Sequence, residues 1–317
     1  MDVTAEPASG RTRDLNIIVA CSNRKTRAVP PTGRLRHVKA TRASTRLNQW
    51  VALLSDDQVS ALPASDLYAG EHWKIAGSLT DRAASVTRLW VCSAGYGLIP
   101  ADAPIRPYSA TFSANHPDGV PGGRAGASAW WAALGEWPGP VDAPRSLAQL
   151  AATSRSTQIL LVLSAQYLAA CRDDVLAAAS KFDSSGQLSI ISAGTKPDPD
   201  LVQYLLPSDA RLQNVMGGTR QSLNVRIAAN LLVSGITDHS AMRNYLAWLL
   251  AAQPPMLRYE RSSMTDEQVS RYIREQLRTN PSTTRTQLLR QLRESGRACE
   301  QHRFGQLYAR QQQVLAS

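Results

Sequence analysis

The sequence predicts an α/β fold in which helices flank a mainly parallel central sheet, followed by a small three-helix module near the C-terminal end. Two observations lead to this prediction. Four short apolar runs alternate with helical stretches, and the last part of the chain consists of capped amphipathic segments. A composition of 43% hydrophobic and 19% charged residues is enough for a sizeable core.

Four strands are expected, at residues 15–20, 88–93, 158–164 and 187–192. Each is a short apolar run, which is typical of a buried strand. Buried strands separated by helices favour a parallel sheet, whose C-terminal strand ends share one edge, and ligands of open α/β sheets bind at that edge. The strand ends read Cys21-Ser22, Ser93-Ala94-Gly95, Ser164-Ala165 and Ser192-Ala193-Gly194.

The α/β domain is expected over residues 15–252, preceded by a flexible polar segment at 1–14. Helices are expected near 44–54 and from 222 to 233. Residues 113–156 break the pattern, since they are rich in Gly, Pro, Ala and Trp. We interpret them as an insertion or lid, with a solvated excursion around a local Trp cluster as the alternative.

Three short helices are expected in residues 258–317. Thr265 with Gln268, and Thr284 with Gln287, have the spacing of capping boxes ahead of apolar residues. A basic third helix suits a helix-turn-helix module that binds DNA. The alternative is a helical tail packed on the α/β domain.

The formal net charge of +10 comes from 35 Lys and Arg against 25 Asp and Glu. Such a surplus attracts polyanions such as DNA, RNA or an anionic membrane face, with a solvated basic surface as the alternative. The surplus lies at the two ends of the chain. The four cysteines are far apart in sequence and lack the spacing of a zinc site, so buried thiols in a reducing cytoplasm are expected, with no metal or other cofactor. No signal peptide and no apolar run long enough to span a bilayer is recognisable.

Polar clusters are expected to converge on the carboxyl edge of the sheet. There Asn23 can read the Watson–Crick edge of a base, Tyr96 or Tyr108 can stack on its face, and backbone N–H groups can bind anionic oxygens. Asp66 and Asp102 can orient water. The alternatives stay open that Tyr96 is a core residue and that Asp66 caps a helix. The assigned residues are Asn23, Asp66 and Asp102 as catalytic; Cys21, Ser22, Lys25, Tyr68, Ser93, Tyr96, Gly97, Tyr108, Ser192, Gly194 and Thr195 as substrate-binding; and Arg24, Arg220, Arg297 and Arg303 as DNA-binding.

Several common chemistries lack their motifs. The sequence has no GxxxxGK[ST] phosphate loop, no GxGxxG after the first strand and no GxSxG elbow. The five histidines are scattered, so none is assigned as a metal ligand.

A set of motifs carries a family resemblance. Cys-Ser-x-x-Lys at 21–25, Asp-Leu-Tyr at 66–68, Ser-Ala-x-Tyr-Gly-Leu-Ile at 93–99 and Pro-Tyr at 107–108 resemble an uncharacterised-domain family of bacteria and phages. That family looks like the uracil-DNA-glycosylase-type α/β fold, which also occurs in a domain of archaeosine synthase. The resemblance covers residues 15–235. Members often carry Asp after the Pro-Tyr pair, where this chain has Ser109.

The arrangement also resembles phage-defence DNA glycosylases that remove glucosylated hydroxymethylcytosine. This resemblance implies excision of a modified base from phage DNA, leaving an abasic site. Two other functions stay open: a non-catalytic reader of modified DNA, and an enzyme that hydrolyses or exchanges bases in RNA or free nucleosides.

Overall fold

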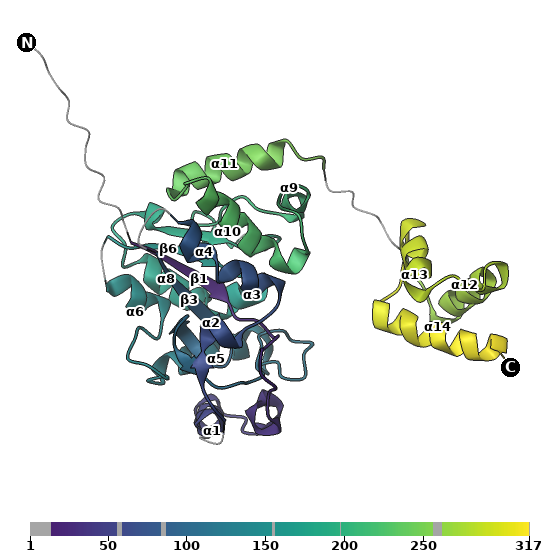
Figure 1. Cartoon of the computed structure of the whole chain (residues 1–317), viewed down its shortest axis with the longest axis horizontal. Helices are drawn as coiled ribbons and strands as arrows, with labels where there is room; N and C mark the ends of the chain where they lie inside the picture. Colours follow the sequence, from purple (N-terminus) through teal and green to yellow (C-terminus); the bar gives the residue numbers. More distant parts are fainter. Residues whose placement is uncertain are drawn as a thin grey trace, which may run out of the picture. The chain divides into compact units, whose positions relative to one another are not determined.

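The computed structural model describes residues 14–55, 59–83, 87–153, 156–196, 198–255 and 262–316. The chain divides into two compact units, one ending at Pro254 and the other beginning at Pro255, and each unit has its own hydrophobic core (Figure 1). The segment expected to be flexible, residues 1–14, lies outside the described residues except for Asp14.

A five-stranded sheet forms the centre of the first unit, and four of its strands are parallel, which confirms the mainly parallel sheet. The chain passes from β1 to β3 on one side and later to β6 on the other, so the direction of winding reverses beside β1. Clefts for ligands form at such a reversal. The order across the sheet is β4 (Gly97–Pro100), β3 (Thr87–Ser93), β1 (Leu15–Ala20), β6 (Gln158–Val162) and β7 (Leu188–Ile191).

The fifth strand, β4, is antiparallel to β3 and was not among the predicted strands. Ser93 pairs with Gly97, so the chain reverses direction over three residues. Gly97 has φ = 73°, a left-handed conformation that glycine adopts without strain. The small residues after β3, which were expected to form an open ligand loop, therefore form a tight turn.

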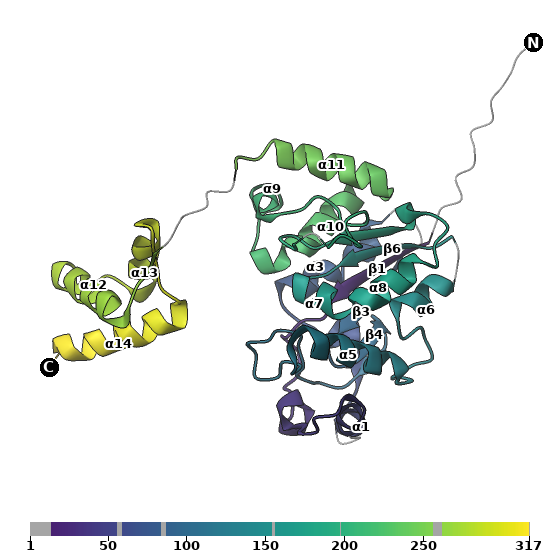
Figure 2. The ribbon, with the colours of Figure 1, turned by 180° about the vertical axis from the view of Figure 1, so that it is seen from behind.

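Helices cover both faces of the sheet. On one face lie α3 (Glu71–Ala76), α4 (Leu79–Arg82) and α10 (Leu223–Val233), and α10 packs against the other two (Figure 1). The other face carries α5 (Gly123–Glu136), α6 (Leu147–Ala152), α7 (Ala165–Ala170) and α8 (Arg172–Ala179) (Figure 2). None of the described helices is long and apolar enough to cross a membrane.

Shorter elements complete the unit. Two small strands, β2 (Leu62–Pro63) and β5 (Pro104–Ile105), pair antiparallel outside the main sheet. The remaining helices are α1 (Ala43–Leu54), α2 (Ala64–Leu67), α9 (Gln213–Met216) and α11 (His239–Ala251), and short 3-10 turns span Pro31–Gly33, Leu35–His37, Ser185–Gln187, Ala210–Leu212 and Arg220–Ser222.

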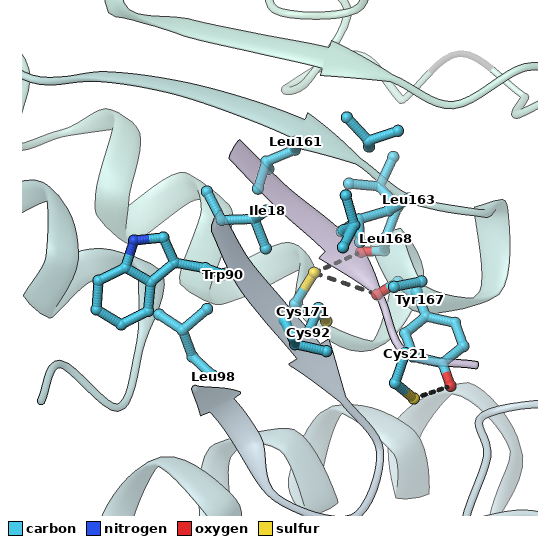
Figure 3. Close-up of a cluster of buried hydrophobic side chains, with 14 of the residues drawn as sticks. Ile18, Cys21, Trp90, Cys92, Leu98, Leu161, Leu163, Tyr167, Leu168 and Cys171 are labelled. Atoms are coloured by element: carbon cyan, nitrogen blue, oxygen red, sulfur yellow. Dashed lines mark hydrogen bonds between the residues drawn. The ribbon is translucent and has the colours of Figure 1, made fainter. Parts of the chain in front are cut away.

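The core forms where the apolar strands meet α7. Ile18 of β1 and Leu161 of β6 are fully buried, and Figure 3 shows them beside Leu168 of α7. Burial of such side chains contributes roughly 1.5–3 kcal/mol each. The expectation of buried thiols is confirmed, because all four cysteines are free and buried.

Residues 113–156 belong to the helical layer of the unit. This segment forms α5 and α6, and Trp130 and Trp131 of α5 are buried. The Trp130 indole donates to the Ala94 carbonyl at 2.7 Å, and the Trp131 indole donates to Asp174 at 2.9 Å. Both the lid and the solvated excursion were therefore wrong, because the Trp cluster packs onto the turn after β3 and onto α8.

The edge strand β7 is covered by the segment that follows it, which folds back alongside the strand. The Ile190 N–H of β7 donates to the Tyr204 carbonyl at 2.8 Å, and the Leu206 N–H donates to the Ile190 carbonyl at 2.8 Å. The segment after β7 thus takes up backbone groups that an edge strand otherwise presents to solvent.

The second unit contains α12 (Asp266–Thr279), α13 (Arg285–Glu294) and α14 (Gln301–Ala316). Both capping boxes form as predicted, with Thr265 and Thr284 as the N-cap residues. Ile273, Leu288 and Phe304, one from each helix, are fully buried in the core of this unit. Two short strands, β8 (Ser262–Ser263) and β9 (Arg297–Ala298), pair in parallel and join the start of the unit to the turn before α14.

Candidate functional site

A polar cavity of about 500 Å³ lies at the carboxyl ends of β1 and β6, where the winding of the sheet reverses. Its size is within the range of small-molecule sites, roughly 300–1,000 Å³. Its walls come from the turn after β1, the start of α3, the end of β6 with α7, and the start of α10. The lining residues that carry polar side chains are Cys21, Ser22, Asn23, Arg24, Glu71, His72, Thr111, Ser164, Tyr167, Thr219, Gln221, Ser222 and Asn224.

The turn after β1 is fixed onto the segment before α3. Ser22 Oγ donates to the Ala69 carbonyl at 2.7 Å, and the Ala69 N–H donates to the Arg24 carbonyl at 2.9 Å. Lys25 forms a single antiparallel bridge with Tyr68. The Cys-Ser-x-x-Lys and Asp-Leu-Tyr motifs therefore come together, as expected, and their pairing gives the cavity wall its shape.

Asn23 projects from this turn as an exposed residue that lines the cavity. Its amide makes no hydrogen bond to any other residue in the described ranges, so both its donor and its acceptor are available to a ligand. By contrast, Asn224 is engaged: its amide donates to the Leu163 carbonyl at 2.8 Å and accepts from the Ala193 N–H at 2.9 Å. Asn224 thus holds the ends of β6 and β7, while Asn23 is available for recognition.

The predicted stacking tyrosines are buried behind the cavity. Tyr68, Tyr96 and Tyr108 are 2%, 2% and 0% exposed, and none of them lines the cavity. The Tyr108 hydroxyl lies 2.8 Å from the Tyr68 hydroxyl and 2.6 Å from Ser93 Oγ. Stacking of Tyr96 or Tyr108 on a base was therefore wrong, because the tight β3–β4 turn and the Tyr108 ring packed on Gly95 close this strand end.

The half-buried Lys25 joins these buried side chains in a group that we call the tyrosine network (Lys25, Tyr68, Ser93, Tyr96 and Tyr108). Its ammonium lies 4.9 Å from the centre of the Tyr68 ring and 4.6 Å from that of Tyr108, and it donates to the Ser22 carbonyl. Burial lowers the pKa of Lys25 to about 8, while the nearby Cys21 opposes the shift. Burial also raises the pKa of Tyr96 to about 12. The network supports the turn that carries Asn23 and does not itself contact the cavity.

Asp66 and Asp102 lie outside the cavity. Both are exposed, Asp66 in α2 and Asp102 in the turn after β4. The Ala101 N–H donates to the Leu89 carbonyl at 3.0 Å, so the antiparallel β4 carries Asp102 away from the carboxyl end of β3. The Ser65 N–H donates to the Ala101 carbonyl at 2.7 Å, which places α2 beside the same turn. Neither carboxylate reaches the site for which it was predicted.

The end of β7 opens on a second cavity of about 650 Å³, and α7 contributes to the walls of both cavities. Gly194 and Thr195 line this second cavity, and Ser192 Oγ lies 2.5 Å from Thr195 Oγ1. Gly97 is buried in β4 against α5. The predicted substrate-binding residues are therefore divided between the first cavity, the tyrosine network, β4 and the end of β7.

Sequence reasoning missed Glu71 and His72, which line the first cavity at the start of α3. Glu71 is the carboxylate among the described lining residues. It accepts from Arg226 at 2.5 Å and from Thr219 Oγ1 at 3.1 Å, and these hydrogen bonds lower its pKa. The one signal in the sequence was an acid and a histidine directly after Gly70, which gives no indication of the cavity by itself.

His72 is held as a neutral imidazole. Its Nε2 lies 3.0 Å from the Ala20 carbonyl, which is only an acceptor, so Nε2 carries the proton and Nδ1 the lone pair. Burial lowers the pKa of His72, although the hydrogen bond to Ala20 opposes the shift. Nδ1 makes no hydrogen bond to another described residue, and a neutral imidazole of this kind can act as a proton acceptor.

The four arginines predicted to bind DNA lie in both units. Arg24 lines the first cavity, and the exposed Arg220 lies between Thr219 and Gln221, which both line it. In the second unit Arg303 is paired with Asp266 at 2.6 Å, and Arg297 lies 4.9 Å from the Tyr272 ring. Arg297 and Arg303 are therefore engaged in contacts within the second unit.

Comparison with family models, curated proteins and solved structures finds no match to this chain. Within the described ranges, no three His, Cys, Asp or Glu side chains form a group that could hold a metal ion.

Proposed function

We propose that the first unit is a DNA glycosylase that hydrolyses the bond between a modified base and its sugar and leaves an abasic site, in defence against phages. The observation that carries the proposal is the polar cavity at the carboxyl ends of β1 and β6. Enzymes that act on a base first flip it out of the duplex into a pocket, and this cavity has a suitable volume. The motif resemblance supports the same reaction class and suggests glucosylated hydroxymethylcytosine as the base.

Asn23 recognises the base and stabilises it as it leaves. Its amide has a donor and an acceptor available in the cavity. These match the edge of a pyrimidine base, which also carries both a hydrogen-bond donor and an acceptor. When the bond between C1′ and the base nitrogen breaks, the bonding electrons leave with the base. Hydrogen-bond donors placed at the developing negative charge lower the barrier, and the Asn23 amide is such a donor.

Glu71 and His72 take the roles that the sequence assigned to Asp66 and Asp102. As C1′ loses the base it acquires positive charge, which the Glu71 carboxylate stabilises. His72 Nδ1 accepts a proton from the attacking water, whose oxygen bonds to C1′. The departing base takes up one proton, so the reaction consumes one water molecule. Arg226 and Thr219 keep Glu71 ionised and in place.

The proposal is tested by incubating the full chain with duplex DNA that contains glucosylated hydroxymethylcytosine, and with ordinary DNA as the control. Abasic sites, labelled with an aldehyde-reactive probe, are expected in the modified DNA alone. Strands are expected to stay intact until alkali or heat is applied. Intact modified DNA would exclude this substrate.

Single substitutions distinguish the catalytic residues proposed here, Asn23 and His72, from Asp66 and Asp102, which were predicted from the sequence. His72→Gln keeps a side-chain N–H donor but removes the basic nitrogen, and we expect at least a roughly 10²-fold lower rate. Asn23→Ala is expected to lower the rate as well. Asp66→Asn and Asp102→Asn are the matched controls, and they are expected to retain activity because both residues lie outside the cavity. Loss of activity in either control would contradict the assignment.

Two contrary results point to other functions. Tight, salt-sensitive binding of modified DNA without base release would indicate a reader. Hydrolysis of free nucleosides or release of bases from RNA, with no action on long DNA, would indicate a nucleoside or RNA enzyme that uses the same cavity.

A further inference from the structure

A groove of about 480 Å³ on the second unit is lined by arginines of α13. Arg285, Arg290 and Arg293 line it together with Gln301 at the start of α14. At 1.5 Å per residue, the three arginines span about 12 Å of the helix axis. The groove is independent of the cavity in the first unit and contains none of the arginines that were assigned to DNA from the sequence.

The groove arginines differ from the other arginines of this unit in what they contact. Arg303 and Arg297 are engaged within the unit, as described above. In contrast, Arg285 makes no hydrogen bond or ion pair to another described residue. Arg290 is 75% exposed, and its pairing with Glu294 at 3.5 Å joins two solvent-exposed side chains. Arg293 donates to the Cys299 carbonyl at 3.3 Å.

Gly305 of α14 makes room for Arg285. A Cβ at this position would lie 3.2 Å from the Arg285 guanidinium, closer than ordinary contact. A glycine inside a helix costs about 1 kcal/mol relative to alanine. Here it allows the Arg285 side chain of α13 to lie against α14.

The start of α14 is not itself an anion site. The Glu300 carboxylate accepts from the backbone N–H groups of His302 and Arg303 at 2.8 and 2.7 Å. The positive charge that lines the groove therefore comes from the α13 arginines. A row of guanidinium groups on an exposed helix is suited to successive phosphates.

We infer that the arginine groove of α13 binds the phosphate backbone of double-stranded DNA without reading its sequence. Double-stranded DNA carries one phosphate charge per about 1.7 Å of helix axis, so three arginines spread over about 12 Å of α13 can meet several phosphates. The choice of DNA as the partner rests on the proposed function. The test measures binding of unmodified DNA and not base excision. Failure of the arginine groove to bind DNA can therefore be distinguished from failure of the proposed glycosylase activity.

The test measures binding of the full chain to an unmodified duplex at several salt concentrations. Each phosphate contact contributes about 0.9 to the slope of log K against log salt. The double variant Arg285→Ala/Arg290→Ala is expected to lower the slope by about 2. The matched control is Arg278→Ala/Arg310→Ala, which removes the same charge from exposed positions outside the groove and is expected to leave the slope unchanged.

A gain of affinity provides a second readout. Glu294 lines the groove and repels phosphate, so Glu294→Gln is expected to tighten binding about twofold, the size of a typical exposed ion pair. A structural role of the groove does not predict this gain. Equal slopes for the two double variants, or retention on vesicles of anionic lipid rather than on duplex DNA, would overturn the inference.

Discussion

Lys25, which was predicted to bind substrate, instead contacts the turn beside the cavity. Its ammonium lies between two tyrosine rings and donates to the Ser22 carbonyl, one residue before Asn23. A cation next to aromatic faces retains part of the stabilisation that it loses on leaving water. Lys25 is therefore a positioning residue for the turn that carries Asn23.

The lowered pKa of Lys25 gives a pH dependence of stability. In the unfolded chain the lysine keeps its proton up to about pH 10.4, whereas in the folded chain it loses the proton near pH 8. Between these values the unfolded state binds more protons, so the contribution of Lys25 to the free energy of unfolding rises with pH. From pH 7 to 9.5 the wild type is expected to gain roughly 1–2 kcal/mol relative to Lys25→Met.

Urea denaturation at both pH values measures this difference. The range stops below pH 10, where tyrosines of the unfolded chain begin to ionise. Lys74→Met, at an exposed lysine of α3, is the control and is expected to follow the wild type. The same pH slope in Lys25→Met and wild type would mean that the Lys25 ammonium is not desolvated.

At the scale of elements, the Trp130 indole forms a buried hydrogen bond between α5 and the turn that follows β3. Trp130 is 1% exposed and donates to the carbonyl of Ala94, in the turn between β3 and β4. Trp130→Phe leaves that buried carbonyl without its donor, which is expected to cost about 1–3 kcal/mol of stability.

The midpoint of urea unfolding measures the loss for Trp130→Phe. Trp248→Phe is the matched control, because Trp248 of α11 is 65% exposed and its replacement is expected to cost little. If the two variants lose the same amount, the indole hydrogen bond does not attach α5 to the turn.

At the scale of the whole molecule, the two units have separate cores and are expected to unfold separately. No residue is shared between the two clusters of buried side chains. Calorimetry of the full chain is expected to show two transitions. Leu288→Ala, a cavity-forming change in the second core, is expected to destabilise by about 2–5 kcal/mol and to lower only one transition. A single transition that shifts as a whole would show that the units unfold together.

The sequence was sufficient to predict features with local signals. The four parallel strands are short apolar runs, and α12 and α13 begin at the predicted capping boxes, such as Thr284 with Gln287. Both signals depend on neighbouring residues along the chain. The existence of the four strands, with bounds within two residues of those observed, and the two N-caps therefore followed from the sequence.

The candidate site depends on contacts between distant segments, and only part of it could be predicted. Asn23 was expected at the carboxyl edge of the sheet because it follows a central parallel strand, and it lines the cavity at that edge. Asp102 was misplaced because an unpredicted antiparallel strand carries it away from that edge. Glu71 and His72 line the cavity because the segment before α3 is hydrogen-bonded to the turn after β1. No local sequence pattern predicts this contact.

The covered edge of β7 affects how the protein behaves at high concentration. An exposed edge strand is a template on which a second chain can add, and growth of this kind leads to fibrils. At β7 the backbone groups of Ile190 are already bonded to the return segment, and at the other edge β4 is short and ends in Pro100, which lacks an N–H. Both margins of the sheet thus disfavour templated growth, so the folded first unit is expected to resist fibril formation even when crowded.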